Sequence, residues 1–519
     1  MAFRTAPRHH PDYAALRVTD MILDNSVAGL INLNLVEKQL VRSAGCFPQN
    51  FNDLGAHYLY GIPKDGQNMN DVEKLLLEQV ELVKKGEFPD WIIPAVINDF
   101  KKSQKEDRER NYKRVELLRD SFLSFVGWEK LDNEIEELEE ISKEDVVKVA
   151  NKYFLSDYVV GFRVDQQHQL PSIEKPEIDP LEIDPDKKSS FMEQVFTLPH
   201  QPFEPRFLKQ GEDFETRKIA SGVTLVHANN PLNDLFNIEV RMEMGYDREP
   251  LLPSIKRFLD RSGANGISTE DLKIEWYKLA TDFGFGVREH FTSFVLNGLD
   301  ENFESSLELS HDLLSKPNIS DESWKETKKI MISERDDEQK NPSALSNALA
   351  HFHRYGDYSR YLKRPSDQQV LNLSIEEVTS ILSDLLNAEK TILYFGPRSI
   401  ESVATTIRKS FLGQSVTTPK TKTKPDRSFA PKENQVFFFH KEMAQSQIRM
   451  EFAVGLYQEN NIPSTQIFNE YFAGGMAGLV FQELREARAL AYSAWACLLY
   501  TSDAADEGLG VDLGGRRII

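Results

Sequence analysis

Residues 471–496 read YFAGGMAGLVFQELREARALAYSAWA, and this stretch decides how the rest of the chain is interpreted. Apolar side chains recur four residues apart at Phe468, Phe472 and Met476, and the same spacing continues through Val480 and Leu484. A stripe of this period predicts an amphipathic helix. The glycines within this helix and the charged and aromatic residues after it indicate the function.

Glycine is concentrated in this helix, at positions 474, 475 and 478. Each glycine weakens a helix by about 1 kcal/mol relative to alanine. Three so close together indicate that another backbone or a bound chain approaches the helix closely. Further on, Arg485 and Tyr492 are seven residues apart. That spacing is two helical turns, so both side chains point to one side if the helix continues.

The run GGMAGLVFQELREARALAYSA resembles the last domain of the insulinase/pitrilysin family of zinc metallopeptidases. The order of features carries the resemblance: small residues, an apolar helix, Leu-Arg, six intervening residues and Tyr. In that family the Arg and the Tyr face the catalytic zinc of another domain. The resemblance therefore assigns Arg485 to the substrate carbonyl oxygen as a charged donor. It assigns Tyr492 to the oxyanion of the tetrahedral intermediate. The alternative from the residues alone is an amphipathic helix with a charged end.

The composition is that of a globular protein with about three domains in 519 residues. A net charge of -20 argues against a nucleic-acid-binding surface, which needs clustered Lys and Arg. Two cysteines, Cys46 and Cys497, exclude a disulfide framework. No apolar run approaches the roughly 18 residues of a membrane span. The first residues read as the inside of a strand, so we expect Met1 to be an internal methionine. The compartment, bacterial cytoplasm or periplasm, is then unknown.

Two internal repeats set the expected architecture. A capped helix followed by a strand recurs at residues 142–164 and 374–395, an offset of 232. Residues 1–37 resemble residues 450–486 at an offset of 449, about twice as far. The unit is therefore a domain of roughly 220–230 residues, within the usual range. In the first copy, Val36 and Ser43 stand where Arg485 and Tyr492 stand in the second.

The expected fold class is α+β, with repeated insulinase-type (mitochondrial-processing-peptidase-like) α/β domains in which helices pack on a mixed sheet. Five segments are predicted. Residues 1–168 form the C-terminal part of one such domain, and residues 169–212 form a proline-rich acidic linker open to proteases. Residues 213–396 form a complete domain without the zinc motif, residues 397–496 a truncated domain with the Arg/Tyr motif, and residues 497–519 a non-native tail.

Hydrophobic periodicity and capping residues predict the elements within these segments. The expected strands are residues 2–6, 58–62, 158–164, 221–228, 236–244, 391–395, 435–439 and 447–454. The expected helices are residues 11–42 in the main, 71–85, 91–126, 142–154, 251–261, 268–282, 302–314, 321–338 and 374–386.

The family's zinc site, His-x-x-Glu-His with a distal Glu, is missing from the 11 histidines of this chain. His351 and His353 are two apart and fall on different helix faces, and Glu334 has no partner ligand. We therefore expect no cofactor in this chain and zinc only in the full-length enzyme. The chain alone is expected to be inactive.

The resemblance implies a fragment of a zinc metalloendopeptidase that contributes the non-catalytic half of a peptide-binding chamber. Its expected partners are a peptide or protein substrate and the missing catalytic domain or a zinc-bearing homologue. One alternative is a zinc-free partner subunit or structural peptide-binding homologue without catalysis. A weaker alternative is an unrelated α/β scaffold.

Overall fold

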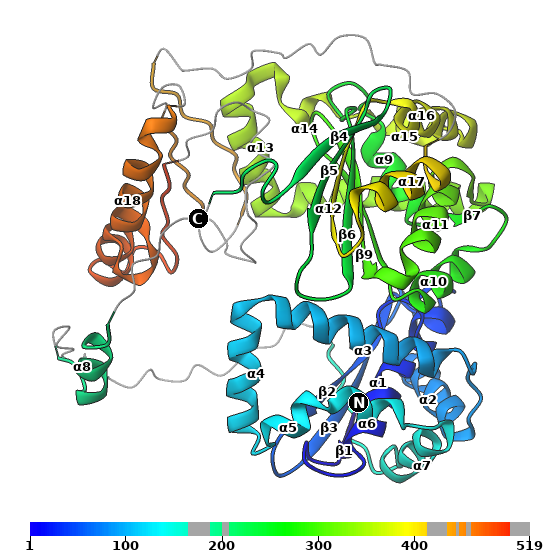
Figure 1. Ribbon diagram of the computed structural model, residues 1–519. Coiled ribbons are helices and arrows are strands. Elements are labelled where there is room, and N and C mark those ends of the chain that lie inside the picture. Colours follow the sequence, from blue (N-terminus) through cyan, green and yellow to red (C-terminus); the bar gives the residue numbers. More distant parts are fainter. Residues whose placement is uncertain (165–186, 200–206, 413–432, 443–445, 453–457, 499–519) are drawn as a thin grey trace. The chain divides into compact units, whose positions relative to one another are not determined.

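The computed structural model describes residues 1–164, 187–199, 207–412, 433–442, 446–452 and 458–498 (Figure 1). The chain divides into two compact units, which are described separately below. The first consists of Met1–Asp24, Leu30–Phe88 and Ile141–Glu215, and the second of Asn25–Gly29, Pro89–Glu140 and Thr216–Ile519. Most of the expected linker and of the expected tail lies outside the described residues.

The first unit contains an antiparallel sheet of order β1-β3-β2. Its strands are β1 (Ala2–Thr5), β2 (Ser43–Asn50) and β3 (Gly55–Ile62). Its helices are α1 (Tyr13–Leu23), the π-helix η1 (Asn32–Val36), α2 (Met69–Lys85), α7 (Lys143–Tyr153) and α8 (Ser190–Phe196).

Local sequence explains how the long helices of this unit begin and end. Ser142 and Asp145 form a capping box at the start of α7, as the sequence predicts. Gly86 ends α2 in the left-handed conformation at φ 71°, which glycine adopts without a steric penalty. Leu16, Ile22 and Leu23 of α1 are buried, so this helix presents an apolar stripe to the core of the unit.

The second unit is built on a sheet of order β4-β5-β11-β6-β9-β8. Its strands are β4 (Glu215–Ala220), β5 (Val223–Asn229), β6 (Leu235–Met242), β8 (Asp282–Val287), β9 (Thr292–Leu299) and β11 (Lys390–Gly396). The sheet is mixed, because β11 runs parallel to β5 and antiparallel to β6. A separate short pair joins β7 (Gly263–Ala264) to β10 (Pro317–Asn318).

Up to Ser410, the second unit contains the following helices. They are α3 (Ile92–Glu109), α4 (Asn111–Leu123), α5 (Trp128–Asp132), α6 (Glu134–Glu139), α9 (Leu252–Leu259), α10 (Thr269–Lys278), α11 (Phe303–Ser315), α12 (Asp321–Lys340), α13 (Pro342–Tyr355), α14 (Arg360–Lys363), α15 (Asp367–Asn372), α16 (Ile375–Asn387) and α17 (Ile400–Ser410). Short 3-10 helices occur at η2 (Asp300–Asn302) and η3 (Gly356–Tyr358).

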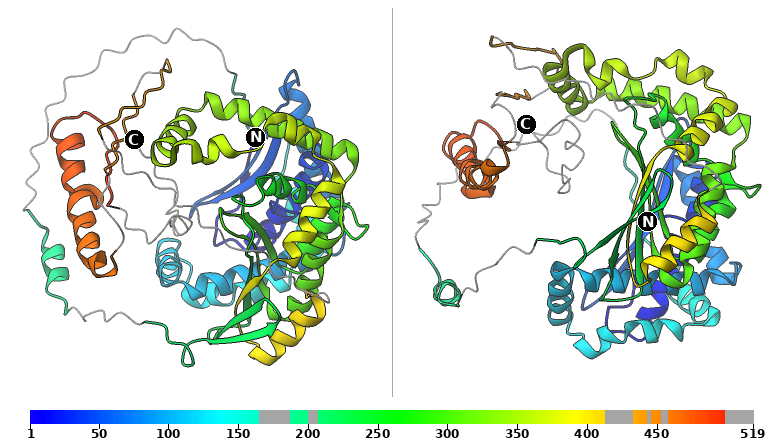
Figure 2. Two further views of the ribbon diagram at one scale, coloured as in Figure 1. Left: turned by 90° about the horizontal axis from the view of Figure 1, so that it is seen from above. Right: turned by 45° about the horizontal axis from the view of Figure 1, so that its top comes forward.

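Buried residues alternate along the central strands, so one face of the sheet forms the core. Ile238 and Ile392 are fully buried there and pack with Phe294 and Leu382. Figures 1 and 2 show α11, α16 and α17 on one side of the sheet. Helices packed on a mixed sheet are the predicted fold class, which the structure confirms.

The C-terminal described residues hold η4 (Glu459–Asn461), α18 (Ile462–Ala473), η5 (Gly475–Ala477), α19 (Leu479–Phe481) and the π-helix η6 (Gln482–Glu486). The predicted 449-residue repeat aligns Ala28-Gly29-Leu30 with Ala477-Gly478-Leu479, and a π-helix follows each of these two segments. Each is followed by a residue with positive φ, Gln39 at 53° and Ala489 at 49°. Because π-helices are rare, their recurrence within one residue of the predicted offset supports the repeat.

Several sequence-based elements are wrong. Residues 158–164 form only an isolated bridge between Val159 and Ala2, not a strand. No strand is present in the described parts of 435–439 and 447–454. Residues 24–29 interrupt the expected helix after α1, where Asp24 is extended. Strand β2 is absent from the expected strands, and it contains Gly45 and Pro48, which are uncommon inside strands.

None of the helices in the described part of the chain combines the length and the hydropathy needed to cross a membrane.

Candidate functional site

Arg485 and Tyr492, the two residues selected from the sequence, lie next to each other. The guanidinium carbon of Arg485 lies 5.0 Å from the centroid of the Tyr492 ring and 4.6 Å from that of Phe481. These distances are those of cation–π contacts. The Tyr492 side chain is 81% exposed. The pair therefore presents a guanidinium and a phenol together at the surface of this segment.

The π-helix η6 positions Arg485, which lies within it. A π turn adds one residue to a helix and redirects the side chains that follow. Ala489 then turns the chain at φ 49°, and its N–H donates to the Arg485 carbonyl at 3.0 Å. The helix does not continue from Arg485 to Tyr492, because it ends before Ala489. The turn brings the two side chains together instead.

The histidines that the sequence analysis considered have ordinary structural partners. His351 lies with Nδ1 3.2 Å from Ser359 Oγ and packs against the Tyr355 ring at 4.4 Å. Glu334 forms an ion pair with Arg257. None of these residues belongs to a group of metal-ligating side chains in the described part of the chain.

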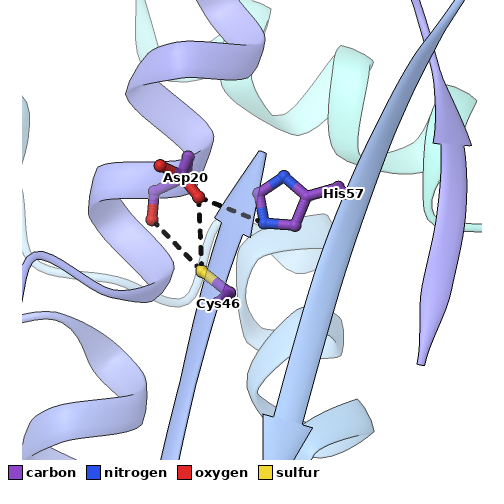
Figure 3. Close-up of side chains that lie close together, drawn as sticks. All are labelled: Asp20, Cys46 and His57. Carbon is purple, nitrogen blue, oxygen red and sulfur yellow. Dashed lines mark hydrogen bonds and ion pairs between the residues drawn. The ribbon is translucent and has the colours of Figure 1, made fainter. Parts of the chain in front are cut away.

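The structure does bring together three residues that the sequence analysis missed: Asp20, Cys46 and His57 (Figure 3). They come from α1, β2 and β3, respectively. The Cys46 thiol donates to Asp20 Oδ1 at 3.4 Å and lies 3.7 Å from the Asp20 carbonyl oxygen. His57 Nε2 lies 3.2 Å from Asp20 Oδ1. We call this group the Asp20–Cys46–His57 cluster.

Sheet register explains why the cysteine and the histidine face the same side. Cys46 is opposite Leu59, and His57 is opposite Pro48. His57 is thus a diagonal neighbour of Cys46, two residues along β3. Asp20 lies on the buried side of α1, four residues after Leu16. A second acid, Asp24, accepts the backbone N–H of Cys46 at 2.9 Å.

Burial makes charge unfavourable throughout the cluster. It raises the pKa of the Asp20 carboxyl to about 7, although the hydrogen bond from Cys46 opposes this shift. Burial, with the nearby carboxyls of Asp20 and Asp24, raises the pKa of the Cys46 thiol well above its ordinary value. Burial also lowers the pKa of the His57 imidazole to about 4. A buried thiol of this kind is a poor nucleophile.

His57 Nε2 is buried, and the structure gives it no hydrogen-bond partner. The 3.2 Å approach to Asp20 therefore lacks the orientation of a hydrogen bond. The His57 side chain is only 2% exposed. A buried polar atom without a hydrogen-bond partner lowers the stability of the folded state by about 1–3 kcal/mol. The unpartnered Nε2 is therefore unusual for a purely structural histidine.

Comparison with known proteins relates part of the chain to one family. Residues 1–100 match the family model described as the peptidase M16 inactive domain. Residues 1–100 are thus similar to an inactive domain of the peptidase M16 family, in agreement with the resemblance stated from the sequence. None of the curated protein sequences matches the chain.

Solved structures with a similar fold include a peptidase M16 inactive domain from Pseudomonas fluorescens. Its identity is 17% and its TM-score 0.43, with coverage of 56% of this chain and 71% of that one. A protease from Helicobacter pylori has 13% identity and a TM-score of 0.42, covering 56% and 72%. The periplasmic protease PqqL from Escherichia coli has 13% identity and a TM-score of 0.38, covering 83% of this chain and 51% of PqqL.

Proposed function

We propose that this chain is a non-catalytic portion of a zinc metalloendopeptidase of the insulinase family. In this role it forms part of the wall of a peptide-binding chamber. The match of residues 1–100 to an inactive domain of this family carries the proposal. The lack of His-x-x-Glu-His in the sequence agrees with it. In this proposal, zinc and the general base belong to another domain or to a homologous subunit.

Arg485 and Tyr492 are proposed to contact the substrate. The Arg485 guanidinium offers planar N–H donors to a peptide carbonyl, and the Tyr492 hydroxyl offers a donor to a developing oxyanion. Their proximity, 5.0 Å between guanidinium carbon and ring centroid, supports a joint role. The exposed Tyr492 ring is available to a ligand.

Peptide binding by the 519-residue chain tests the chamber role. Fluorescence anisotropy with a labelled, extended peptide is expected to show binding, and mass spectrometry is expected to show the peptide uncleaved. Arg485→Ala should weaken binding. Arg488→Ala is the matched control, because Arg488 is three residues away and pairs with a nearby glutamate, Glu483, as Arg485 does with Glu486. Cleavage by the purified chain would overturn the non-catalytic assignment, and equal binding by both variants would overturn the role of Arg485.

The alternative function is that of a zinc-free partner subunit that binds peptides without any catalytic role. The two functions differ in the effect of Arg485 and Tyr492 on turnover. The experiment is to assemble the chain with its zinc-bearing half and measure kcat. A loss of kcat in Tyr492→Phe favours the peptidase, whereas unchanged kcat with altered peptide affinity favours the partner subunit.

A further inference from the structure

We propose that the Asp20–Cys46–His57 cluster is a binding site for a divalent transition metal, with Zn²⁺ as the best-matched ion. This site lies outside the Arg485–Tyr492 pair and does not depend on the proposed peptidase role. It also revises the expectation that the chain holds no metal. The inference rests on the ligand types, their separations and the unpartnered histidine nitrogen.

The ligand types favour zinc over the hard divalent cations. A thiolate and an imidazole are ligands that Zn²⁺ takes readily, whereas Mg²⁺ and Ca²⁺ require oxygen donors. Ionised Cys46 and Asp20 would supply two negative charges, and neutral His57 none. The set therefore balances the charge of a divalent ion, which removes the main cost of burying it.

The separations are those of a tetrahedral site. Bond lengths of about 2.0–2.3 Å from a tetrahedral zinc to N, O and S ligands place neighbouring ligand atoms roughly 3.3–3.6 Å apart. Asp20 Oδ1 lies 3.4 Å from Cys46 Sγ and 3.2 Å from His57 Nε2. All three ligand atoms lie within 4.8 Å of one another. Small side-chain movements suffice to enclose an ion, and the fourth position is left for water.

The histidine nitrogen supplies an independent observation. His57 Nε2 is buried, has no hydrogen-bond partner and points toward Asp20 and Cys46 (Figure 3). With the ring proton on Nδ1, a metal bond would give Nε2 the partner that the protein does not supply. The imidazole is also held in orientation, because its ring meets the Phe154 ring edge-on at a centroid distance of 5.1 Å.

Asp24 holds Cys46 and Asp20 in place through hydrogen bonds. Residues that hydrogen-bond to metal ligands commonly orient them in this way. Asp24 Oδ2 accepts the Cys46 N–H at 2.9 Å, which fixes the cysteine backbone. The Asp24 N–H in turn donates to the Asp20 carbonyl at 2.8 Å. A bound metal would tie α1 to β2 and β3, so we expect its effect to be on the stability of the first unit.

Metal content of the full chain is the first test. The chain is purified without a metal-affinity tag, incubated with ZnCl₂ and dialysed, and zinc is measured by mass spectrometry. We expect about one zinc per chain, at least tenfold less in Cys46→Ala and His57→Gln, and no change in Cys497→Ser, the other cysteine of the chain. Wild-type protein without zinc, or Cys46→Ala with the same zinc as wild type, would overturn the proposal.

Wild-type protein alone gives a second test that does not depend on folding of the variants. Cys46 and Cys497 are alkylated with and without ZnCl₂, and each labelling rate is followed by peptide mass spectrometry. Zinc should slow alkylation of Cys46 at least tenfold and leave Cys497 unchanged. Co²⁺ in place of zinc should give a thiolate charge-transfer absorption. Equal protection of both thiols, or of neither, would overturn the site.

Discussion

The Arg485 guanidinium carbon lies 5.0 Å from the centroid of the Tyr492 ring, although a helix end and a left-handed residue separate the two in sequence. The contact results from η6 and from the turn at Ala489, not from a continuous helix. A cation held against a phenol ring keeps both groups oriented, while the Tyr492 residue stays 81% exposed. That arrangement suits two groups that act on one ligand.

Tyr492→Phe tests the proposed role in catalysis, in the chain assembled with its zinc-bearing half. If the hydroxyl donates to a developing oxyanion, kcat should fall by about 10²–10³, the range for loss of one such donor. KM should change little, because that bond strengthens only in the transition state. Steady-state kinetics measure both constants.

Arg485→Lys extends this test and supplies its control. A lysine keeps the charge but lacks the planar fork of donors, so activity should also fall. Melting temperatures of both variants separate a catalytic effect from a structural one. Wild-type kcat accompanied by a lower melting temperature would assign the pair to packing.

Ser142→Ala should destabilise the first unit by about 1 kcal/mol, the usual cost of losing an N-cap. Ser142 Oγ accepts the Asp145 N–H at 3.2 Å, and the Asp145 carboxylate accepts the Ser142 N–H at 3.1 Å. Urea unfolding monitored by circular dichroism measures the change. Ser142→Thr retains a capping hydroxyl and should remain close to wild type; an equal loss in both variants would show that the cap is not the cause.

Caps and periodicity could be predicted from the sequence because they are local. Ser142 and Ser374 both form the expected capping boxes. The Asp20–Cys46–His57 cluster could not be predicted from the sequence, because only the register of β2 and β3 and the packing of α1 bring its members together. One signal was present: Asp20 falls on the apolar stripe of α1, between Leu16 and Leu23. An acid on a buried stripe requires a partner, and the sequence does not say which.

Trp324→Phe should cost about 1 kcal/mol rather than the 3–5 kcal/mol of a large core truncation. The Trp324 ring packs edge-on against Phe258 at 5.1 Å, and phenylalanine retains much of that contact. The lost bond is Nε1–H to the Leu373 carbonyl at 2.9 Å. That carbonyl keeps a second donor, Lys328 Nζ, at 2.9 Å.

A paired variant checks this explanation by chemical denaturation. Lys328→Met removes the second donor, so the double variant should lose more than the sum of the single changes. Strict additivity would show that the Leu373 carbonyl is satisfied in another way.

Lys390 makes stability depend on pH in the alkaline range. It is buried in β11, and Nζ donates to the Ala388 carbonyl at 2.8 Å and to the Leu386 carbonyl at 2.5 Å. Burial lowers the pKa of Lys390 to about 8 from its ordinary value of 10.5. Between these two values the unfolded chain binds the proton and the folded chain does not, so the contribution of Lys390 to stability rises with pH.

Lys390→Met isolates this effect from the other groups that titrate at high pH. The free energy of unfolding of the variant minus that of wild type should fall by roughly 2–3 kcal/mol between pH 7 and pH 10, since one pKa unit corresponds to about 1.36 kcal/mol. The two carbonyls that lose a donor add an offset that does not vary with pH. Urea denaturation of both proteins at several pH values measures the difference. A difference that stays constant across this range would mean that Lys390 keeps its ordinary pKa in the folded protein.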